Sequence, residues 1–260
     1  MVPVCICGGS GYTGVELIRL LSGHPDVKIV AITSERQKGQ VVTSIYPHLK
    51  GVFEEEFRSI EDPALLKEAE VFFLALPHGE ALKWTEHFYD KGKFVIDLSA
   101  DCRLRDPEDY EQWYGLTHKR PDLLKVAAYG IPEIYRERIQ ASRLVANPGC
   151  YPTGALLGLY PLVREDLIET DRIIIDSKSG VSGAGRKADL SLIFTEVNES
   201  FKAYGVTTHR HTPEIEMVLT ELTGQKTTVE FTPHLLPVTR GILTTIYAKL
   251  KTPKEEKALV

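Results

Sequence analysis

A short apolar run at the start of the chain leads directly into a glycine-rich loop and then into an amphipathic segment. The run is Val2–Cys7, and Gly9, Gly11 and Gly14 satisfy the pattern G-x-G-x-x-G. Glycines at this spacing permit a tight turn and let the backbone at a helix N-terminus approach a phosphate group. The same glycines are also compatible with an ordinary strand-to-helix turn. Because strand, loop and helix follow in the required order, the loop predicts the first βαβ unit of a dinucleotide-binding domain.

Further apolar runs alternate with helical segments over the first 149 residues. They are continuously apolar, as is typical of parallel strands buried on both faces, and comprise Val27–Thr33, Val71–Leu76, Phe94–Leu98 and Leu144–Ala146. The first intervening segment carries Val15, Ile18 and Leu21 at helical spacing. The alternation predicts an α/β domain with a doubly wound parallel sheet of the Rossmann type over residues 1–149.

The pattern changes after Cys150. Longer runs rich in Thr and Ile predict strands at Arg172–Asp176, Thr227–Thr232 and Leu243–Leu250. An amphipathic helix is predicted over Glu214–Leu222, with Thr212 as its cap and Pro213 in its first position. These elements predict a second α+β domain, residues 150–260, with a mixed and mostly antiparallel sheet. A capping box at Thr252–Glu255 predicts a further helix that the sequence does not complete, so we expect the natural C-terminus to be missing.

Composition restricts the partners. The chain has 260 residues and a formal net charge of −5, which gives a nucleic-acid partner no electrostatic support. No apolar run reaches the ~18 residues of a membrane span, and the N-terminus has no basic leader. The four cysteines include no CxxC pair, so we expect neither a disulfide framework nor a zinc site, and we expect a cytoplasmic protein.

The residues after the second predicted strand bear on the type of cofactor. NAD-binding domains place an acidic residue there for the ribose hydroxyls, whereas the 2′-phosphate of NADP requires hydrogen-bond donors. Ser34, Arg36 and Lys38 are donors, while Glu35 favours NAD. The basic side chains could instead simply solvate a loop. The balance of donors predicts NADP.

Cys150 lies in the string Asn-Pro-Gly-Cys-Tyr-Pro-Thr, between a predicted strand and a helix expected from Thr153 onward. Near a helix N-terminus the dipole and backbone amides favour thiolate over thiol, which is the condition for a nucleophilic cysteine. Buried cysteines are more often inert, and that interpretation suits Cys5 and Cys7 on the first strand. The Pro-Gly turn favours a nucleophile at Cys150.

The string His209-Arg-His211-Thr-Pro-Glu214 offers a proton carrier near neutral pH. Glu214 is placed to orient either imidazole. The pattern could also be a metal site, although a third His or Cys at ligand spacing is missing, or a structural pair of histidines.

Two polar loops follow predicted strands. Ser177–Arg186 is rich in glycine and could wrap the nicotinamide or a substrate phosphate, or simply be a flexible surface loop. Asp97–Arg103 ends a strand at the edge where open α/β sheets bind ligands. Arg103 is a candidate for an anionic substrate group, and pairing with Asp101 or Asp106 is the alternative.

Together these strings resemble the N-acetyl-γ-glutamyl-phosphate reductase family. The resemblance spans nearly the whole chain and rests on GGSGYTG at 8–14, LALPHG at 74–79, DLSADCRL at 97–104, YGIPE at 129–133, NPGCYPT at 147–153, SGVSGAG at 179–185 and HRHTPEIE at 209–216. The cysteine and histidine strings are specific, whereas the glycine loop is not. Cys102 departs from the family where an aromatic residue is expected, and Glu35 interrupts the usual Ser-Arg pair.

The resemblance implies a second domain like that of glyceraldehyde-3-phosphate and aspartate-semialdehyde dehydrogenases, and a homodimer or homotetramer. It implies NADPH-dependent reduction of N-acetylglutamyl 5-phosphate to the semialdehyde with release of phosphate. Cys150 takes the position of the nucleophile, with His211 as acid/base and His209 and Glu214 beside it. The expected cofactor contacts are Gly8, Ser10, Gly11, Tyr12, Thr13, Gly14, Ser34, Arg36, Pro77, Ser182 and Gly183, and the expected substrate contacts are Arg103, Asn147, Ser179 and Gly180. Family members are longer at the C-terminus.

Other functions compete with this interpretation. The same chemistry could act on aspartyl phosphate or on a carrier-bound aminoadipyl phosphate, although Tyr151-Pro152 favours the acetylglutamyl substrate. A non-catalytic NADP-binding regulator and a metal-dependent hydrolase are more distant alternatives.

Overall fold

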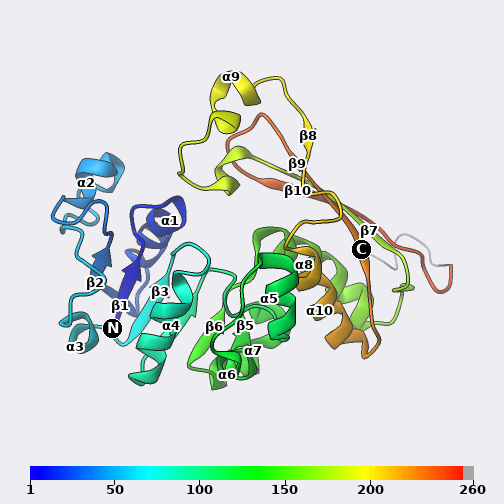
Figure 1. Ribbon diagram of the computed structural model, residues 1–260, viewed down its shortest axis with the longest axis horizontal. Helices are drawn as coiled ribbons and strands as arrows, with labels where there is room; N and C mark the ends of the chain where they lie inside the picture. Colours follow the sequence, from blue (N-terminus) through cyan, green and yellow to red (C-terminus); the bar gives the residue numbers. More distant parts are fainter. Residues whose placement is uncertain (254–260) are drawn as a thin grey trace. The chain divides into compact units, whose positions relative to one another are not determined.

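The computed structural model describes residues 1–253 of the chain. The chain divides into two compact units (Figure 1). The first unit comprises Met1–Arg103 and Lys119–Pro148, and the second comprises Leu104–His118 and Gly149–Val260. The segment Leu104–His118, which contains helix α5 (Pro107–Tyr114), thus groups with the second unit.

The first unit is built on a six-stranded parallel sheet with the order β2-β1-β3-β4-β6-β5. The strands are β1 (Val2–Cys7), β2 (Val27–Thr33), β3 (Val71–Leu74), β4 (Phe94–Asp97), β5 (Ala128–Tyr129) and β6 (Leu144–Ala146). The predicted doubly wound sheet is confirmed. The two-residue strand β5 was not predicted, because so short a segment carries no periodic pattern.

Helices connect these strands: α1 (Tyr12–Leu21), α2 (Val42–Ile45), η1 (Pro47–Leu49), α3 (Leu65–Glu68), α4 (Ala81–Asp90), α6 (Pro121–Val126) and α7 (Pro132–Ala141). The side chains of β1 alternate between two separate hydrophobic clusters. Ile6 packs with Ile18 of α1, while Cys5 and Cys7 pack with Phe88 of α4. Alternation in a strand points successive side chains to opposite faces, so both faces of this sheet are buried. Cys5 and Cys7 are fully buried with their sulfurs 3.9 Å apart, as expected for structural cysteines.

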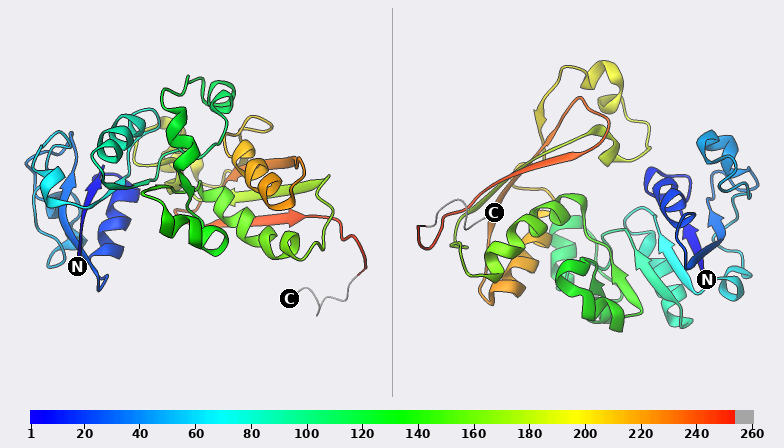
Figure 2. Two further views of the ribbon diagram at one scale, coloured as in Figure 1. Left: turned by 90° about the horizontal axis from the view of Figure 1, so that it is seen from below. Right: turned by 180° about the vertical axis from the view of Figure 1, so that it is seen from behind.

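The second unit contains a four-stranded mixed sheet with the order β10-β7-β9-β8 (Figures 1 and 2). Its strands are β7 (Ile173–Ser179), β8 (Lys202–Ala203), β9 (Val229–Leu235) and β10 (Ile242–Tyr247). The pairs β10–β7 and β8–β9 are antiparallel, whereas β7–β9 is parallel. The expected mixed, mostly antiparallel sheet is confirmed.

Two long helices pack on this sheet, α8 (Cys150–Arg164) against β10 and α10 (Thr212–Thr223) against β9, and they also contact each other. The shorter helices of the unit are η2 (Val181–Ala184), η3 (Leu190–Leu192) and α9 (Phe194–Val197). Helix α8 begins at Cys150 rather than at the predicted Thr153, so the sulfur is on the first helical residue.

The start of α10 corrects a second prediction. The cap position is His211, and Thr212 is the first helical residue. The Thr212 hydroxyl is buried and has no hydrogen-bond partner among residues 1–253, so the prediction that it caps the helix is wrong. Pro213 lies in the first turn, where its missing N–H leaves no helical bond unmade.

The predicted capping box at Thr252–Glu255 extends beyond residue 253 and therefore lies outside the described residues. No helix within residues 1–253 is both long enough and apolar enough to cross a membrane.

Candidate active site

The glycine loop between β1 and α1 is packed so closely that three of its glycines are required by the protein itself. Gly8 has a φ of +86°, and a Cβ there would lie 2.2 Å from the carbonyl oxygen of Ala75. A Cβ on Gly9 would lie 2.0 Å from Ile32, and one on Gly14 would lie 2.5 Å from the oxygen of Gly8. These positions therefore fix the turn and the close approach of α1 to β1.

Gly11 differs from its neighbours. Its φ of −86° and ψ of 168° suit any residue, and the nearest atom to a Cβ there is 3.6 Å away. It caps α1, whose first turn (Tyr12, Thr13, Gly14) has no acidic residue and no side-chain cap. A helix N-terminus of this kind attracts an anion. The packing of the protein therefore does not require glycine at position 11, and its contact with the cofactor stays a prediction.

The end of β2 shows how Glu35 is used. Its carboxylate accepts a hydrogen bond from the backbone N–H of Ile60 at 2.8 Å and another from the Ser59 hydroxyl at 3.1 Å. Glu35 is therefore engaged with the crossover to β3 rather than presented as an acceptor for ribose. The neighbouring Ser34 is buried, and its hydroxyl lies 2.8 Å from that of Ser10 in the glycine loop.

Two other predicted cofactor contacts of this unit are exposed at strand ends. Arg36 follows β2, and Pro77 follows β3. The Pro77 carbonyl accepts hydrogen bonds from the first turn of α4. The same turn is held by Asp101, whose buried carboxylate accepts from the N–H groups of Gly79 and Leu82, at 2.8 and 2.9 Å for the closer contacts.

Arg103 and Asn147 join the ends of β4 and β6. The guanidinium of Arg103 is buried and donates to the carbonyl of Asn147 at 2.7 Å and to that of Leu98 at 2.9 Å. Burial raises the pKa of the neighbouring Asp97 to about 6, although its carboxylate accepts two hydrogen bonds from Ser99. Arg103 thus braces the loop that was predicted to bind an anion, and its contact with substrate stays a prediction.

Cys150 occupies the first position of α8 in the second unit, and its side chain is exposed. The preceding residue, Gly149, is held by Glu214 of α10. The Glu214 carboxylate is fully buried and accepts the N–H of Gly149 at 2.7 Å. The structure shows that Glu214 anchors the turn before the nucleophile, and its predicted role in orienting an imidazole stays a prediction.

The imidazole of His211 packs directly on Gly149. A Cβ on Gly149 would lie 2.5 Å from Nε2 of His211 and 2.8 Å from each of its two neighbouring ring carbons. The Nε2 end of the ring therefore faces the residue that precedes Cys150. This contact favours His211 as the proton carrier for the cysteine, since a general base must lie within hydrogen-bond reach of its target.

His209 has a different environment, in which its ring lies among aromatic side chains. Burial, with a smaller contribution from the charge of Arg210, lowers the pKa of His209 to about 4. Its Nδ1 accepts the backbone N–H of His211 at 3.1 Å.

Sequence reasoning missed Tyr204. Its hydroxyl lies 2.8 Å from that of Tyr151, the residue after the nucleophile. Burial and the bond to Tyr151, with a smaller contribution from Cys150, raise the pKa of Tyr204 above its ordinary value. Because a single Tyr after a two-residue strand has no recognisable pattern, only the fold identifies this residue.

The loop after β7 is closed by a second stretch that was also missed, residues 238–241. A Cβ on Gly180 would lie 2.7 Å from the backbone nitrogen of Arg240. The N–H groups of Gly180 and Ser182 donate to carbonyls of this stretch at 3.0 Å. Ser179 is buried at the end of β7, and Gly183 lies within η2. The predicted contacts Ser179, Gly180, Ser182 and Gly183 therefore share one loop of the second unit.

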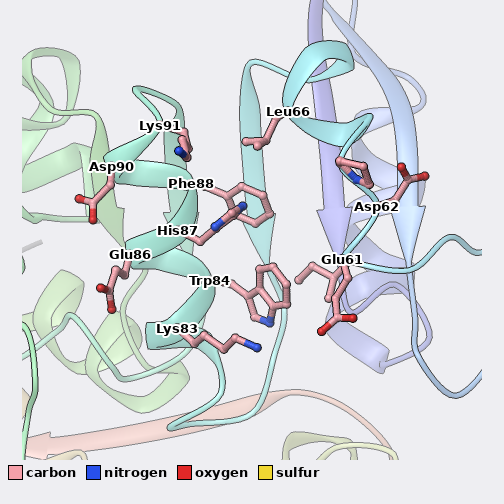
Figure 3. Close-up of a pocket in the computed structure, with 12 residues that line it drawn as sticks. Glu61, Asp62, Leu66, Lys83, Trp84, Glu86, His87, Phe88, Asp90 and Lys91 are labelled. Atoms are coloured by element: carbon pink, nitrogen blue, oxygen red, sulfur yellow. The ribbon is translucent and has the colours of Figure 1, made fainter.

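A pocket of about 620 Å³ lies in the first unit between α4 and the segment 60–66 (Figure 3). Trp84, Phe88 and Leu66 form much of its apolar wall, and Lys83 lies over the indole of Trp84 at 4.8 Å. None of the predicted site residues lines it. Within the described part of the chain, no three His, Cys, Asp or Glu side chains are grouped to hold a metal ion.

Both halves of the chain match the domains of a known protein family. Residues 3–142 match the semialdehyde dehydrogenase NAD-binding domain, and residues 150–260 match the semialdehyde dehydrogenase dimerisation domain. The N-acetyl-gamma-glutamyl-phosphate reductase of Heliobacterium modesticaldum is 51% identical over 254 residues, which cover 96% of this chain and 72% of that protein. The protein of the same name from Pelotomaculum thermopropionicum is 50% identical over 258 residues, covering 99% and 74%.

Solved structures agree on the fold. Aspartate semialdehyde dehydrogenase II from Vibrio cholerae aligns with a TM-score of 0.74 at 16% identity, covering all of this chain and 77% of that one. The Candida albicans aspartate semialdehyde dehydrogenase, solved with NADP, gives 0.74 at 15% identity, with coverage of 100% and 75%. The chain belongs to the semialdehyde dehydrogenase family and, within it, to the N-acetyl-γ-glutamyl-phosphate reductases.

Proposed function

We propose that the chain reduces N-acetyl-L-glutamyl 5-phosphate to N-acetyl-L-glutamate 5-semialdehyde with release of phosphate, as a step of arginine biosynthesis. The names of relatives about 50% identical over nearly the whole chain support this reaction. The single structural observation that carries the chemistry is the pairing of Cys150, on the first residue of α8, with His211 packed against Gly149. This arrangement supplies a nucleophile and a proton carrier on one rigid scaffold.

NADP is the proposed cofactor, and residues 1–149 are proposed as its binding domain, with residues 150–260 as the catalytic and dimerisation domain. The open position at Gly11 and the uncapped N-terminus of α1 fit a pyrophosphate. Ser34 and the exposed Arg36 would hold the 2′-phosphate, because the carboxylate of Glu35 is engaged with Ser59 and Ile60. The reduced cofactor, when bound, supplies the hydride.

In the proposed mechanism, the Cys150 sulfur attacks the acyl carbon of the substrate. The first residue of α8 experiences the positive end of the helix dipole, which favours thiolate. Attack forms a thioester and expels phosphate. After reduction of the thioester carbonyl, the hemithioacetal collapses to the aldehyde, and His211 transfers the proton between its oxygen and the departing sulfur.

A homodimer or homotetramer in the cytoplasm is the proposed assembly. The second unit exposes several large apolar side chains: Leu190, Ile193, Phe194, Phe201, Val206, Val238, Ile242, Leu243 and Tyr247. Apolar side chains that form a contiguous exposed patch are typical of an interface. The match of residues 150–260 to a dimerisation domain also supports self-association. None of the four cysteines, all of which lie in the described residues, forms a disulfide.

The decisive experiment combines a substrate panel with a cysteine variant. Purified protein is assayed with acetylglutamyl, aspartyl and aminoadipyl phosphates, each with NADPH and with NADH. We expect turnover with the acetylglutamyl substrate and NADPH, and its loss in Cys150→Ser with NADPH binding retained. Full activity of Cys150→Ser would exclude the thioester route, and faster turnover of another acyl phosphate would replace the substrate.

A further inference from the structure

The two imidazoles of the His-Arg-His segment have different surroundings, although a single residue separates them. The His209 ring lies within an aromatic enclosure, with centroid separations of 5.6 Å to Tyr151, 5.6 Å to Tyr204 and 5.3 Å to Phe231. A Cβ on Gly205 would lie only 3.2 Å from Cδ2 of His209, so the turn after Tyr204 also closes on the ring. The ring is therefore held in one orientation.

A hydrogen bond fixes the position of the proton on this ring. The backbone N–H of His211 donates to Nδ1 of His209 at 3.1 Å. An imidazole nitrogen that accepts a hydrogen bond carries no proton, so the neutral ring must carry its proton on Nε2. Within residues 1–253, Nε2 of His209 forms no hydrogen bond, which leaves this N–H group for a ligand.

The groups around the ring keep it neutral. Arg210 is the charged neighbour, while Tyr151 and Tyr204 bring hydroxyl groups and His211 brings a second imidazole. Burial and the charge of Arg210 hold the pKa of His209 near 4, well below neutral pH. A ring of this kind is a poor base at pH 7 but a permanent hydrogen-bond donor.

The enclosure also links His209 to the nucleophile. Tyr151 directly follows Cys150 on α8, and its hydroxyl is bonded to that of Tyr204. Burial and the bond to Tyr151 raise the pKa of Tyr204, and Cys150 adds a smaller contribution in the same direction. Two of the residues that touch His209, Tyr151 and Tyr204, are therefore linked to the residue that carries the reacting sulfur.

We propose that His209 is a catalytic residue that stays neutral throughout the reaction and donates its Nε2 hydrogen to the carbonyl oxygen of the acyl group attacked by Cys150. This role rests on the proposed function. It gives the two histidines different tasks, since His209 donates a hydrogen bond to the oxyanion and His211 transfers the proton. Fixed neutral donors aimed at an oxyanion lower the barrier because they need no reorganisation when the charge develops.

The chemistry balances without a change in the protonation of His209. When the thiolate adds, the carbonyl π electrons move to oxygen, and the N–H group of His209 stabilises this oxyanion. The C=O bond then re-forms and phosphate leaves. Hydride addition to the thioester produces a second oxyanion at the same place, and its collapse expels the Cys150 sulfur and yields the aldehyde.

Two substitutions by neutral residues distinguish the role of the Nε2 donor of His209 from that of its Nδ1 acceptor. His209→Asn keeps an acceptor near Nδ1 for the His211 N–H but is too short to reach the position of Nε2. His209→Gln places an amide N–H near that position. For one missing oxyanion donor we expect kcat to fall by ~10²–10³-fold in His209→Asn. The loss in His209→Gln should stay within about tenfold, with the pH profile of kcat/KM unchanged in both variants.

A spectroscopic measurement tests the protonation state without relying on activity. In the wild-type chain labelled with ¹⁵N-histidine, the ring signals of His209, assigned by their loss in His209→Asn, should report the Nε2-protonated neutral form from pH 8 to pH 5.5. Titration of these signals near pH 6.5, or loss of a limb of the pH profile in either variant, would overturn the proposal. Wild-type protein that is inactive on every acyl phosphate would count against the proposed function, whereas the NMR result decides the state of His209 separately.

Discussion

Replacement of Gly149 by alanine tests whether the His211 imidazole acts where the structure places it. The backbone of Gly149 has φ −65° and ψ 155°, which alanine adopts without strain. The added Cβ would lie 2.5 Å from Nε2 of His211, whereas nonbonded atoms approach to about 3.5 Å. The ring must therefore retreat by about 1 Å, a displacement that costs on the order of 10²-fold in rate. The loss of stability should be about 1 kcal/mol.

The assay is a double-mutant cycle on the phosphate-dependent oxidation of the semialdehyde, followed by the absorbance of NADPH. We expect Gly149→Ala to lower kcat by about 100-fold in the wild-type background but by less than about threefold in the His211→Ala background, because the displaced group is then absent. Thermal unfolding monitors the fold of each variant. A second 100-fold loss in the His211→Ala background would refute the reasoning, since Gly149 would then act independently of the imidazole.

Three further predictions concern the cofactor loop and stability. Gly11→Ala should raise the KM for NADPH by about tenfold or more and leave Tm unchanged. Gly14→Ala should lower Tm, because its Cβ would lie 2.5 Å from a backbone oxygen. A lower Tm in Gly11→Ala with an unchanged Tm in Gly14→Ala would contradict the roles given to these two glycines. Arg36→Ala should raise the KM for NADPH and not that for NADH, while Glu35→Gln should change the ratio of the two little, because the carboxylate is held by Ser59 and Ile60. Since the folded pKa of His209 is lowered from 6.5 to about 4, the unfolded chain binds a proton first as the pH falls. The neutral ring therefore contributes fully to the free energy of unfolding above pH 6.5. This contribution, about 1–2 kcal/mol after allowance for partial exposure, is lost as the pH falls from 6.5 to 4. In urea unfolding, His209→Gln should lack this pH dependence.

Most of the fold could be predicted because a parallel sheet buried on both faces leaves continuous apolar runs in the sequence. The bounds of β1, β2 and β6 agree with the predicted runs to the residue. The strands β5 and β8 were missed because each has two residues, and their pairing depends on neighbours distant in the chain. The pattern of nearby residues does not predict such pairing between distant segments.

The candidate site likewise contains residues that the sequence predicts and contacts that only the folded chain shows. Cys150 and the histidines stand in strings whose chemistry is visible locally. The bond between Glu214 and the Gly149 amide joins residues 65 positions apart, and the steric need for glycine at 149 comes from the ring of His211, which caps another helix. Glu35 was ambiguous because the sequence shows a carboxylate but not the direction in which it is held.

The hydrogen bonds around Glu35 have a consequence for attempts to redesign cofactor preference. The stretch from Glu56 to Ile60 runs beside the end of β2, with the Arg58 N–H donating to Ile32 and the Arg58 carbonyl accepting from Ser34. Two stretches separated by some twenty residues thus form one structural module. An exchange of residues 33–38 alone would separate them from the residues that hold them in place. A variant of this chain with altered cofactor preference therefore has to exchange residues 33–38 and 56–60 together.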